Sequence, residues 1–144
     1  MTTLADQLAH STAIFEICEG LAQLRKDLDG FVMGGSFTCG SAFVCNPPVL
    51  DTDLDAVALV GGDPEAIWRV LEPLGYTNCS KAGESYPEGD HCIVRKGRMN
   101  FIIVTTKVRF EQWRKATDIC KALNLTDKAE RVVVYQILRD ELQL

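Results

Sequence analysis

Histidine is scarce in this sequence, and closely paired cysteines are absent from it. It has two histidines and six cysteines in 144 residues, and no two cysteines have the C-x-x-C spacing of a zinc or redox motif. The composition therefore does not favour a zinc site. We expect reduced, mostly buried thiols that act as small apolar side chains.

Long apolar runs are also absent. No stretch is long enough to span a bilayer, and residues 1–6 lack the basic-then-apolar layout of a signal peptide. No internal repeat or low-complexity segment interrupts the chain. We therefore expect one domain over residues 1–144, located in the cytoplasm and without a membrane partner.

Positive charge is scarce in the first half of the chain. Residues 1–72 contain 3 basic and 11 acidic side chains, whereas residues 73–144 contain 12 and 9. The net charge of −5 argues against a general nucleic-acid binder, which would be basic overall. The asymmetry favours a protein with an acidic, cation-attracting side and a basic side.

The hydrophobic pattern predicts an α/β (α+β) fold with a mixed β-sheet and helices packed on one side of it. Residues 76–90 are polar and carry glycine and proline, so we expect a loop there. The predicted elements are a helix 3–28, a strand 31–33, a helix 36–45, a strand 49–60, a helix 64–74, a hairpin 91–94 and 99–105, and helices 107–123 and 127–142.

The first predicted helix has an apolar stripe with a three–four spacing, which is typical of a face that packs on a core. Leu21 and Leu24 widen this stripe. Its members are Leu4, Leu8, Ser11, Phe15, Cys18, Ala22 and Arg25.

Two carboxylates stand one residue apart at the head of an apolar run, in Asp53-Leu54-Asp55 followed by residues 56–60. Alternate side chains of a strand share one face, so Asp53 and Asp55 would lie side by side. A divalent metal that bridges phosphate oxygens needs such a pair. The other interpretation is that these aspartates, with Asp51, are turn residues that open the strand.

A small-residue segment, Gly34-Gly35-Ser36, precedes the pair. It predicts a tight strand-to-helix turn with Ser36 at the N-cap. Such a turn also lets backbone N–H groups approach a phosphate closely.

Together, the glycine turn and the paired aspartates resemble the nucleotidyltransferase superfamily, the fold of polymerase β and of the poly(A) and tRNA-terminal enzymes. The resemblance covers about residues 30–106, followed by a helical part over about 107–144. It implies that Gly34, Gly35 and Ser36 hold the nucleotide phosphates, and that Asp53 and Asp55 hold Mg²⁺ or Mn²⁺ and take part in catalysis.

The same resemblance places Asn100 where the family has a third metal-binding carboxylate. An amide oxygen can bind Mg²⁺ but carries no charge and cannot act as a base. The C-terminal segment is similar to small phage-encoded members of the superfamily, which would place the protein in the cytoplasm of a host. The residues that carry this likeness are Phe110, Trp113, Cys120, Leu123 and 128–131.

Three basic residues lie in the predicted hairpin turn: Arg95, Lys96 and Arg98. They are either an ordinary solvated turn or phosphate contacts near the cleft.

Two functions follow from the resemblance. The first is Mg²⁺-dependent transfer of a nucleotidyl group from a nucleoside triphosphate to a hydroxyl of a protein or RNA acceptor. The second is a catalytically inactive binding protein of the same fold, which binds a nucleotide or a host protein. The amide at position 100 favours the second function, and the retention of both aspartates favours the first.

Overall fold

The computed structural model describes residues 3–46, 49, 53–78 and 91–141. Its elements are α1 (Leu4–Asp27), β1 (Val32–Cys39), α2 (Ser41–Val44), β2 (Leu54–Gly61), α3 (Pro64–Leu71), a 3₁₀ turn η1 (Glu72–Leu74), β3 (Thr77–Asn78), β4 (His91–Lys96), β5 (Met99–Val104), α4 (Lys107–Ala122) and α5 (Lys128–Glu141). Polar residues cap two of the helices: Thr3 and Asp6 form a capping box on α1, and Asp63 accepts a hydrogen bond from the Ala66 N–H of α3.

The five strands form one mixed sheet in the order β1-β2-β5-β4-β3. β2 and β5 run parallel at its centre, and the other neighbours are antiparallel. The central strands are the most apolar, and the residues of β2 from Ala56 to Ala58 are fully buried. The predicted mixed α/β sheet is therefore confirmed.

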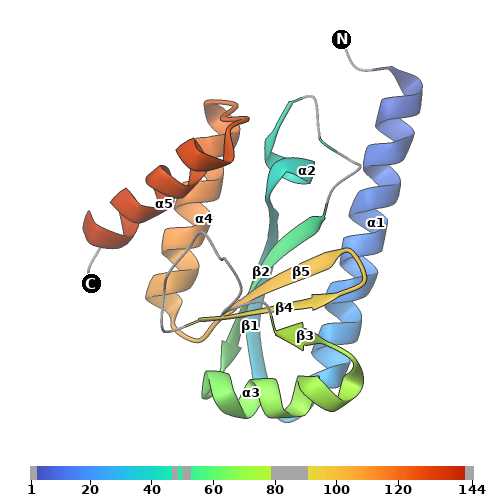
Figure 1. Cartoon of the computed structure of the whole chain (residues 1–144), viewed down its shortest axis with the longest axis vertical. Coiled ribbons are helices and arrows are strands. Elements are labelled where there is room, and N and C mark those ends of the chain that lie inside the picture. Colours follow the sequence, from blue (N-terminus) through green and yellow to red (C-terminus); the bar gives the residue numbers. More distant parts are fainter. Residues whose placement is uncertain (1–2, 47–48, 50–52, 79–90, 142–144) are drawn as a thin grey trace.

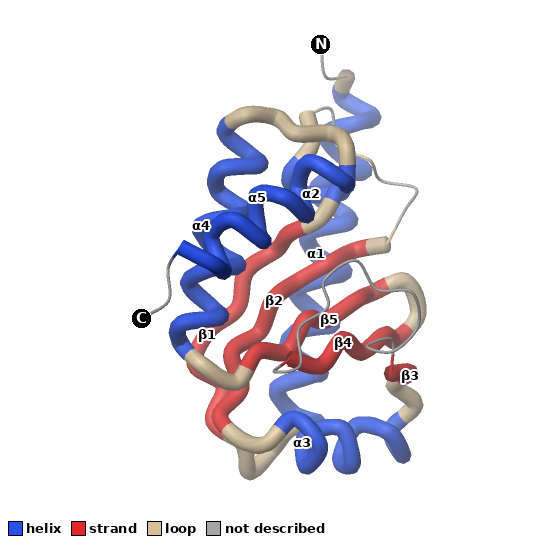
Figure 2. The backbone as a smooth tube through the Cα atoms, turned by 60° about the vertical axis from the view of Figure 1, so that its left-hand side comes forward, coloured by secondary structure: helices blue, strands red, loops and turns tan. Residues whose placement is uncertain are grey.

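Helices cover both faces of the sheet, so the expected one-sided packing is wrong (Figures 1 and 2). α1 and α3 pack on one face, where Ile17, Leu24 and Ile67 join a core with Phe101. α4 and α5 pack on the other face, where Phe110, Trp113 and Tyr135 join a second core. In the buried central strands, residues that point to either face of the sheet are apolar. A sheet with helices on both faces requires this pattern.

The segment predicted as a turn followed by a helix over 36–45 is mostly strand. β1 runs through Gly34, Gly35 and Ser36 to Cys39, and it pairs with β2 along this length. The helix that remains, α2, has only four residues. Pairing with the apolar strand β2 satisfies the backbone of these residues, and this tertiary gain overrides their local turn preference.

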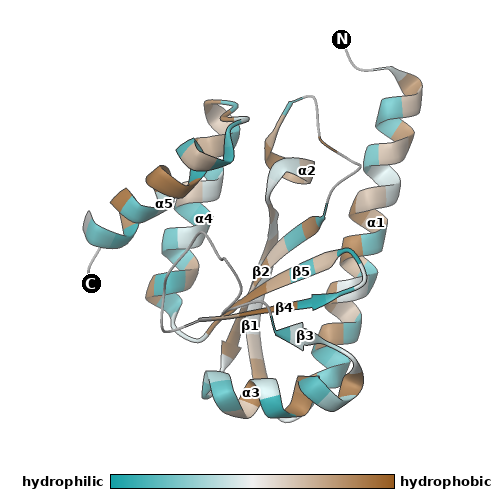
Figure 3. Cartoon of the chain, viewed as in Figure 1, coloured by the Kyte–Doolittle hydropathy of each residue, from teal (hydrophilic) through white to brown (hydrophobic). Residues whose placement is uncertain are grey.

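The stripe predicted to bury α1 faces solvent instead, except for the two residues predicted to widen it, since Leu24 is buried and Leu21 packs against the core. Leu4, Leu8 and Phe15 are 71%, 61% and 72% exposed, respectively. The buried residues of α1 are Ala13, Ile17, Gly20 and Leu24, which lie on the opposite side of the helix. Figure 3 shows that apolar residues recur along the whole of α1, whose N-terminal turns extend beyond the sheet.

Candidate functional site

A row of polar side chains crosses one face of the sheet near the start of the two parallel strands. Cys39 of β1 is paired with Asp55 of β2, Asp55 with Asn100 of β5, and Asn100 with Arg95 of β4. Since strand neighbours in register share a face, the four side chains lie side by side. Asp53, two residues before Asp55, shares this face. We call Asp53, Asp55, Asn100 and Arg95 the carboxylate row, which Cys39 borders.

Asn100 joins the two carboxylates. Its Nδ2 donates to Asp53 Oδ2 at 3.2 Å and to Asp55 Oδ1 at 3.1 Å. Arg95 forms an ion pair with the other oxygen of Asp53. The sequence-predicted residues Asp53, Asp55 and Asn100 therefore lie together, and their role as metal ligands stays a prediction.

Asp55 has an unusual acidity. Burial raises the pKa of its carboxyl to about 6, and the neighbouring charge of Asp53 raises it as well. The hydrogen bond from Asn100 and the charges of Lys128 and Arg95 act in the opposite direction. A carboxyl with a pKa near neutrality can exchange a proton under ordinary conditions, which is a common property of functional sites.

The turn that meets this row lies at Gly40 and Ser41. Gly40 has a φ of 76°, a conformation that glycine adopts most readily. A Cβ atom at this position would overlap Asp55 Oδ2 and would lie 2.8 Å from Asp55 Cγ. Gly40 is thus the residue that lets the chain pass directly against the Asp55 carboxylate.

The strand-to-helix turn predicted at Gly34-Gly35-Ser36 is therefore wrong, and the role of these residues in phosphate binding stays a prediction. These residues lie inside β1, with Gly35 paired to Leu59 and Ser36 to Ala58, farther along the sheet than the Cys39–Asp55 pair. A Cβ atom on Gly35 would lie 3.3 Å from the Phe110 ring, so this glycine allows α4 to approach the sheet. A second Gly-Ser pair, at 40–41, was the sequence signal for the actual turn.

Of the three basic residues of the predicted hairpin, only Arg95 belongs to the carboxylate row. Arg98 pairs with Glu16 of α1, at 2.8 Å between Nε and Oε2. Lys96 donates to the Leu74 carbonyl at 3.2 Å, and its ammonium lies 4.7 Å from the centre of the Tyr76 ring.

α5 brings two further cations toward the row, which the sequence reasoning did not assign to it. The positive charge of Lys128 lowers the pKa of Asp55, and that of Arg131 lowers the pKa of Cys39, although burial and Asp55 together raise the latter well above its usual value. Arg131 is held by a 3.0 Å hydrogen bond from Nη1 to the Leu125 carbonyl. The basic start of α5 thus borders the acidic centre of the row.

The donor set of the row decides which metal could fit. Among the residues that the structure describes, no three acidic, histidine or cysteine side chains are grouped as a metal site, and Asp51 lies outside these residues. Mg²⁺ is usually held by one or two carboxylates together with substrate phosphates rather than by a cage of protein ligands. Two carboxylates, and an amide that presents Oδ1 when turned over, fit one such ion.

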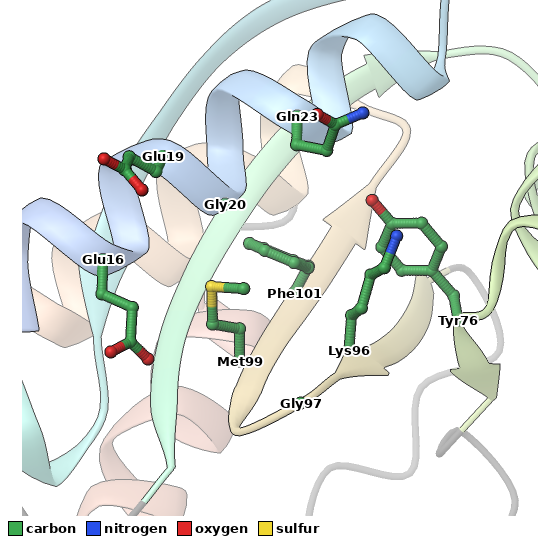
Figure 4. Close-up of a pocket in the computed structure, with 9 residues that line it drawn as sticks. All are labelled: Glu16, Glu19, Gly20, Gln23, Tyr76, Lys96, Gly97, Met99 and Phe101. Atoms are coloured by element: carbon green, nitrogen blue, oxygen red, sulfur yellow. The ribbon is translucent and has the colours of Figure 1, made fainter.

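A pocket lies on the opposite face of the sheet, between α1 and the β4–β5 turn (Figure 4). Glu16 and Glu19 line it on the helix side, and Met99 and Phe101 line it on the sheet side. Met99 and Phe101 flank Asn100 in β5 and point away from it. The pocket is thus separated from the carboxylate row by the sheet itself.

Comparison with known proteins identifies the fold. No family model and no curated protein match the sequence. A crystal structure of the conserved protein GrpB from Enterococcus faecalis superposes with a TM-score of 0.55 at 15% sequence identity, over 91% of this chain and 93% of that one. At this identity the likeness shows the fold alone, which is an α/β fold with a five-stranded mixed sheet. In the described part of the chain, no helix combines the length and apolarity needed to cross a bilayer.

Proposed function

We propose that the protein binds a nucleoside triphosphate together with one Mg²⁺ ion at the carboxylate row. The observation that carries this proposal is the convergence of Asp53 and Asp55 on Asn100, at the amino ends of the parallel strands β2 and β5. Two like charges held this close, with one of them largely buried, gain most from a bound cation.

The acidic and basic residues at the row would bind different parts of the ligand. Asp53 and Asp55 would hold the ion, with Asn100 turned to present its amide oxygen, and the ion would neutralise phosphate charge. Arg95 and Lys128 would contact the phosphates. The Arg95 Nε is buried and has no hydrogen-bond partner among the described residues, so one guanidinium donor remains to be satisfied.

The charge of the row favours binding over rapid transfer. Transfer through two metal ions needs enough negative charge to hold both ions against their mutual repulsion. The row contains two carboxylates, one already paired with Arg95, and an amide in the third position. A second ion would therefore be bound weakly.

Thermal unfolding tests the binding proposal, because a ligand that binds only the folded state must stabilise it. Mg²⁺ or Mn²⁺ with a nucleoside triphosphate should raise the melting temperature, and the double variant Asp53→Asn/Asp55→Asn should lose this rise. The control is Asp29→Asn/Asp118→Asn, which removes two exposed carboxylates elsewhere. An equal rise in both double variants would contradict the proposal.

Nucleotidyl transfer to a hydroxyl of a protein or RNA is the second candidate, and the pKa of Asp55 favours it. A carboxylate with a pKa of about 6 is a better general base than an ordinary aspartate. We expect slow or absent transfer of labelled nucleotide by the wild type, and tighter Mg²⁺ binding by Asn100→Asp in calorimetry. Gln7→Glu, which adds the same charge on exposed α1, should bind Mg²⁺ as the wild type does. Rapid transfer by the wild type would make this second candidate the function.

A further inference from the structure

α1 carries two apolar stripes on opposite sides, and only one of them has a partner within the chain. The buried stripe consists of Ala13, Ile17, Gly20 and Leu24. The exposed stripe, which we call the outer stripe, is Leu4, Leu8, Ser11, Phe15, Cys18 and Ala22. An amphipathic helix with a single partner needs one apolar face, so the second stripe indicates a second partner.

The N-terminal turns of α1 have little support from their own chain. No described residue before Ala13 is buried, and the His10 ring lies 6.2 Å from the Phe43 ring of α2 by ring centres. Figure 1 shows these turns extending past the end of the sheet beside α2. A helix segment of this length is marginal by itself in water, so packing along its outer side would stabilise it.

The outer stripe repeats with the alternating four–three spacing of a helix that pairs with another helix. It contains no charged residue from Leu4 to Ala22 and extends over about 27 Å of helix. Ile14, which borders it, is 41% exposed and widens the apolar strip.

We propose that the outer stripe is the pairing surface for a second copy of this chain, with the two α1 helices antiparallel. In this arrangement Leu4 faces Ala22, Leu8 faces Cys18 and Ser11 faces Phe15 of the other copy. A large side chain meets a small one in each layer, which is how facing helices fill space without voids. The helix dipoles also run in opposite directions, and no like charges meet within the stripe.

The stripe is self-complementary in this register, and that property selects a second copy as the occupant. The two-fold symmetry of such a pair uses the same patch on both molecules. The pair leaves the carboxylate row free, because α1 and the row lie on opposite faces of the sheet.

Sedimentation velocity over about 1 to 300 μM tests the proposal, since this range covers the affinities of small interfaces. The wild type should shift from monomer to dimer. Leu8→Gln/Phe15→Gln should stay monomeric over the whole range and keep the melting temperature of the wild-type monomer. The control is Val133→Gln/Ile137→Gln, which alters two half-exposed apolar residues of α5 and should dimerise as the wild type does.

Cross-linking tests the orientation. Among the described cysteines Cys18 alone is exposed, so a Cys79→Ser background leaves it as the accessible thiol. Leu8→Cys in this background should form a disulfide-linked dimer with Cys18 on oxidation, and further addition of Cys18→Ser should abolish it. A monomer at every concentration, loss of the dimer in the α5 control, or a Cys18–Cys18 cross-link in the background protein would overturn the proposal.

Discussion

Among single residues, Asp55 shows most clearly how environment sets chemistry. Asp55 lies directly against the Gly40 backbone, and the charge of Lys128, at the start of α5, acts on it. The side chain of Asp53, the other aspartate of the pair, is 41% exposed. Burial raises the pKa of Asp55 to about 6, and Asn100 and the nearby cations limit that rise. Position alone therefore gives the Asp55 carboxyl an acidity different from that of a free aspartate.

The pKa of Asp55 predicts how stability depends on pH without metal. An unfolded aspartate titrates near 3.9, so the folded state binds more protons than the unfolded state between about pH 4 and pH 6. The contribution of Asp55 to stability should fall as the pH rises through this window and remain lost above it. Asp55→Asn should then be more stable than the wild type at pH 7.5, by on the order of 1–3 kcal/mol.

Urea unfolding at pH 4 and pH 7.5, with a chelator present, measures this effect. Asp29→Asn removes an exposed carboxylate and should leave the pH dependence unchanged. An Asp55→Asn protein that is less stable than the wild type at pH 7.5 would show that the charged carboxylate supports the fold.

Arg95 both neutralises Asp53 and offers a donor to a phosphate. Its removal should therefore have opposite effects on the affinity for free Mg²⁺ and on the affinity for the Mg²⁺–nucleotide complex. Arg95→Gln should bind free Mg²⁺ more tightly, because the competing cation is gone, and bind the Mg²⁺–nucleotide complex more weakly, by about tenfold, for loss of a charge-assisted contact. Calorimetric titrations with metal alone and with metal plus nucleotide measure both changes. Arg69→Gln breaks an exposed pair with Glu65 and should alter neither affinity. Parallel changes in both affinities would refute the division of roles.

Among the elements, the β1–α2 connection positions the site. β1 ends at Cys39, Gly40 turns the chain with a positive φ, and α2 begins at Ser41. This connection brings the backbone against Asp55, so a change at Gly40 should reach the carboxylate row directly.

Gly40→Ala should therefore lower the free energy of unfolding for two reasons. A non-glycine residue at the φ of 76° and ψ of 177° of Gly40 costs about 1–3 kcal/mol, and the added Cβ must displace the Asp55 carboxylate. Gly30→Ala is the matched control, because Gly30 has a φ of 102° and no atom within 4 Å of an added Cβ. We expect both variants to lose stability in thermal unfolding, and Gly40→Ala alone to lose the stabilisation by Mg²⁺ and nucleotide. Retention of that stabilisation would show that the turn does not set the position of Asp55.

For the whole molecule, the sheet separates two cores that the chain builds from different helices. α5 is held in the second core through Tyr135, which is 1% exposed. The centre of its ring lies 4.1 Å from that of the Trp113 ring of α4. The same helix brings Lys128 and Arg131 to the carboxylate row. Docking of α5 thus couples stability to the charge of the site.

Tyr135→Ala should lower the free energy of unfolding by about 3–5 kcal/mol, the cost of removing a buried aromatic side chain. It should also loosen α5 and so shift the pKa of Asp55, because Lys128 of this helix acts on that carboxyl. Urea unfolding measures the stability, and the pH profile described for Asp55 measures the pKa. Val133→Ala removes a half-exposed side chain of the same helix and should cost much less. Similar losses in the two variants would show that Tyr135 does not anchor α5.

The sequence by itself determined the local features. The apolar periodicity located the two C-terminal helices closely, and α4 and α5 lie within a residue or two of their predicted ends. The period of two along a strand placed Asp53 and Asp55 on one side, because alternation is a property of the backbone of each strand. The β4–β5 hairpin also follows from its own glycine turn, with Gly97 at a φ of 63°.

Only the tertiary structure decided which partners these elements meet. Parallel pairing of β2 with β5 brought Asn100 to Asp55, and pairing of β5 with β4 brought Arg95, from residues some forty positions away. β1 became a strand through Gly34–Ser36 because β2 was there to pair with it. On α1, two stripes of equal spacing were available, and the sheet selected Ile17 and Leu24 over Leu8 and Phe15. Periodicity gives the existence of an apolar face, but the choice between two faces depends on the shape and volume of what packs against them.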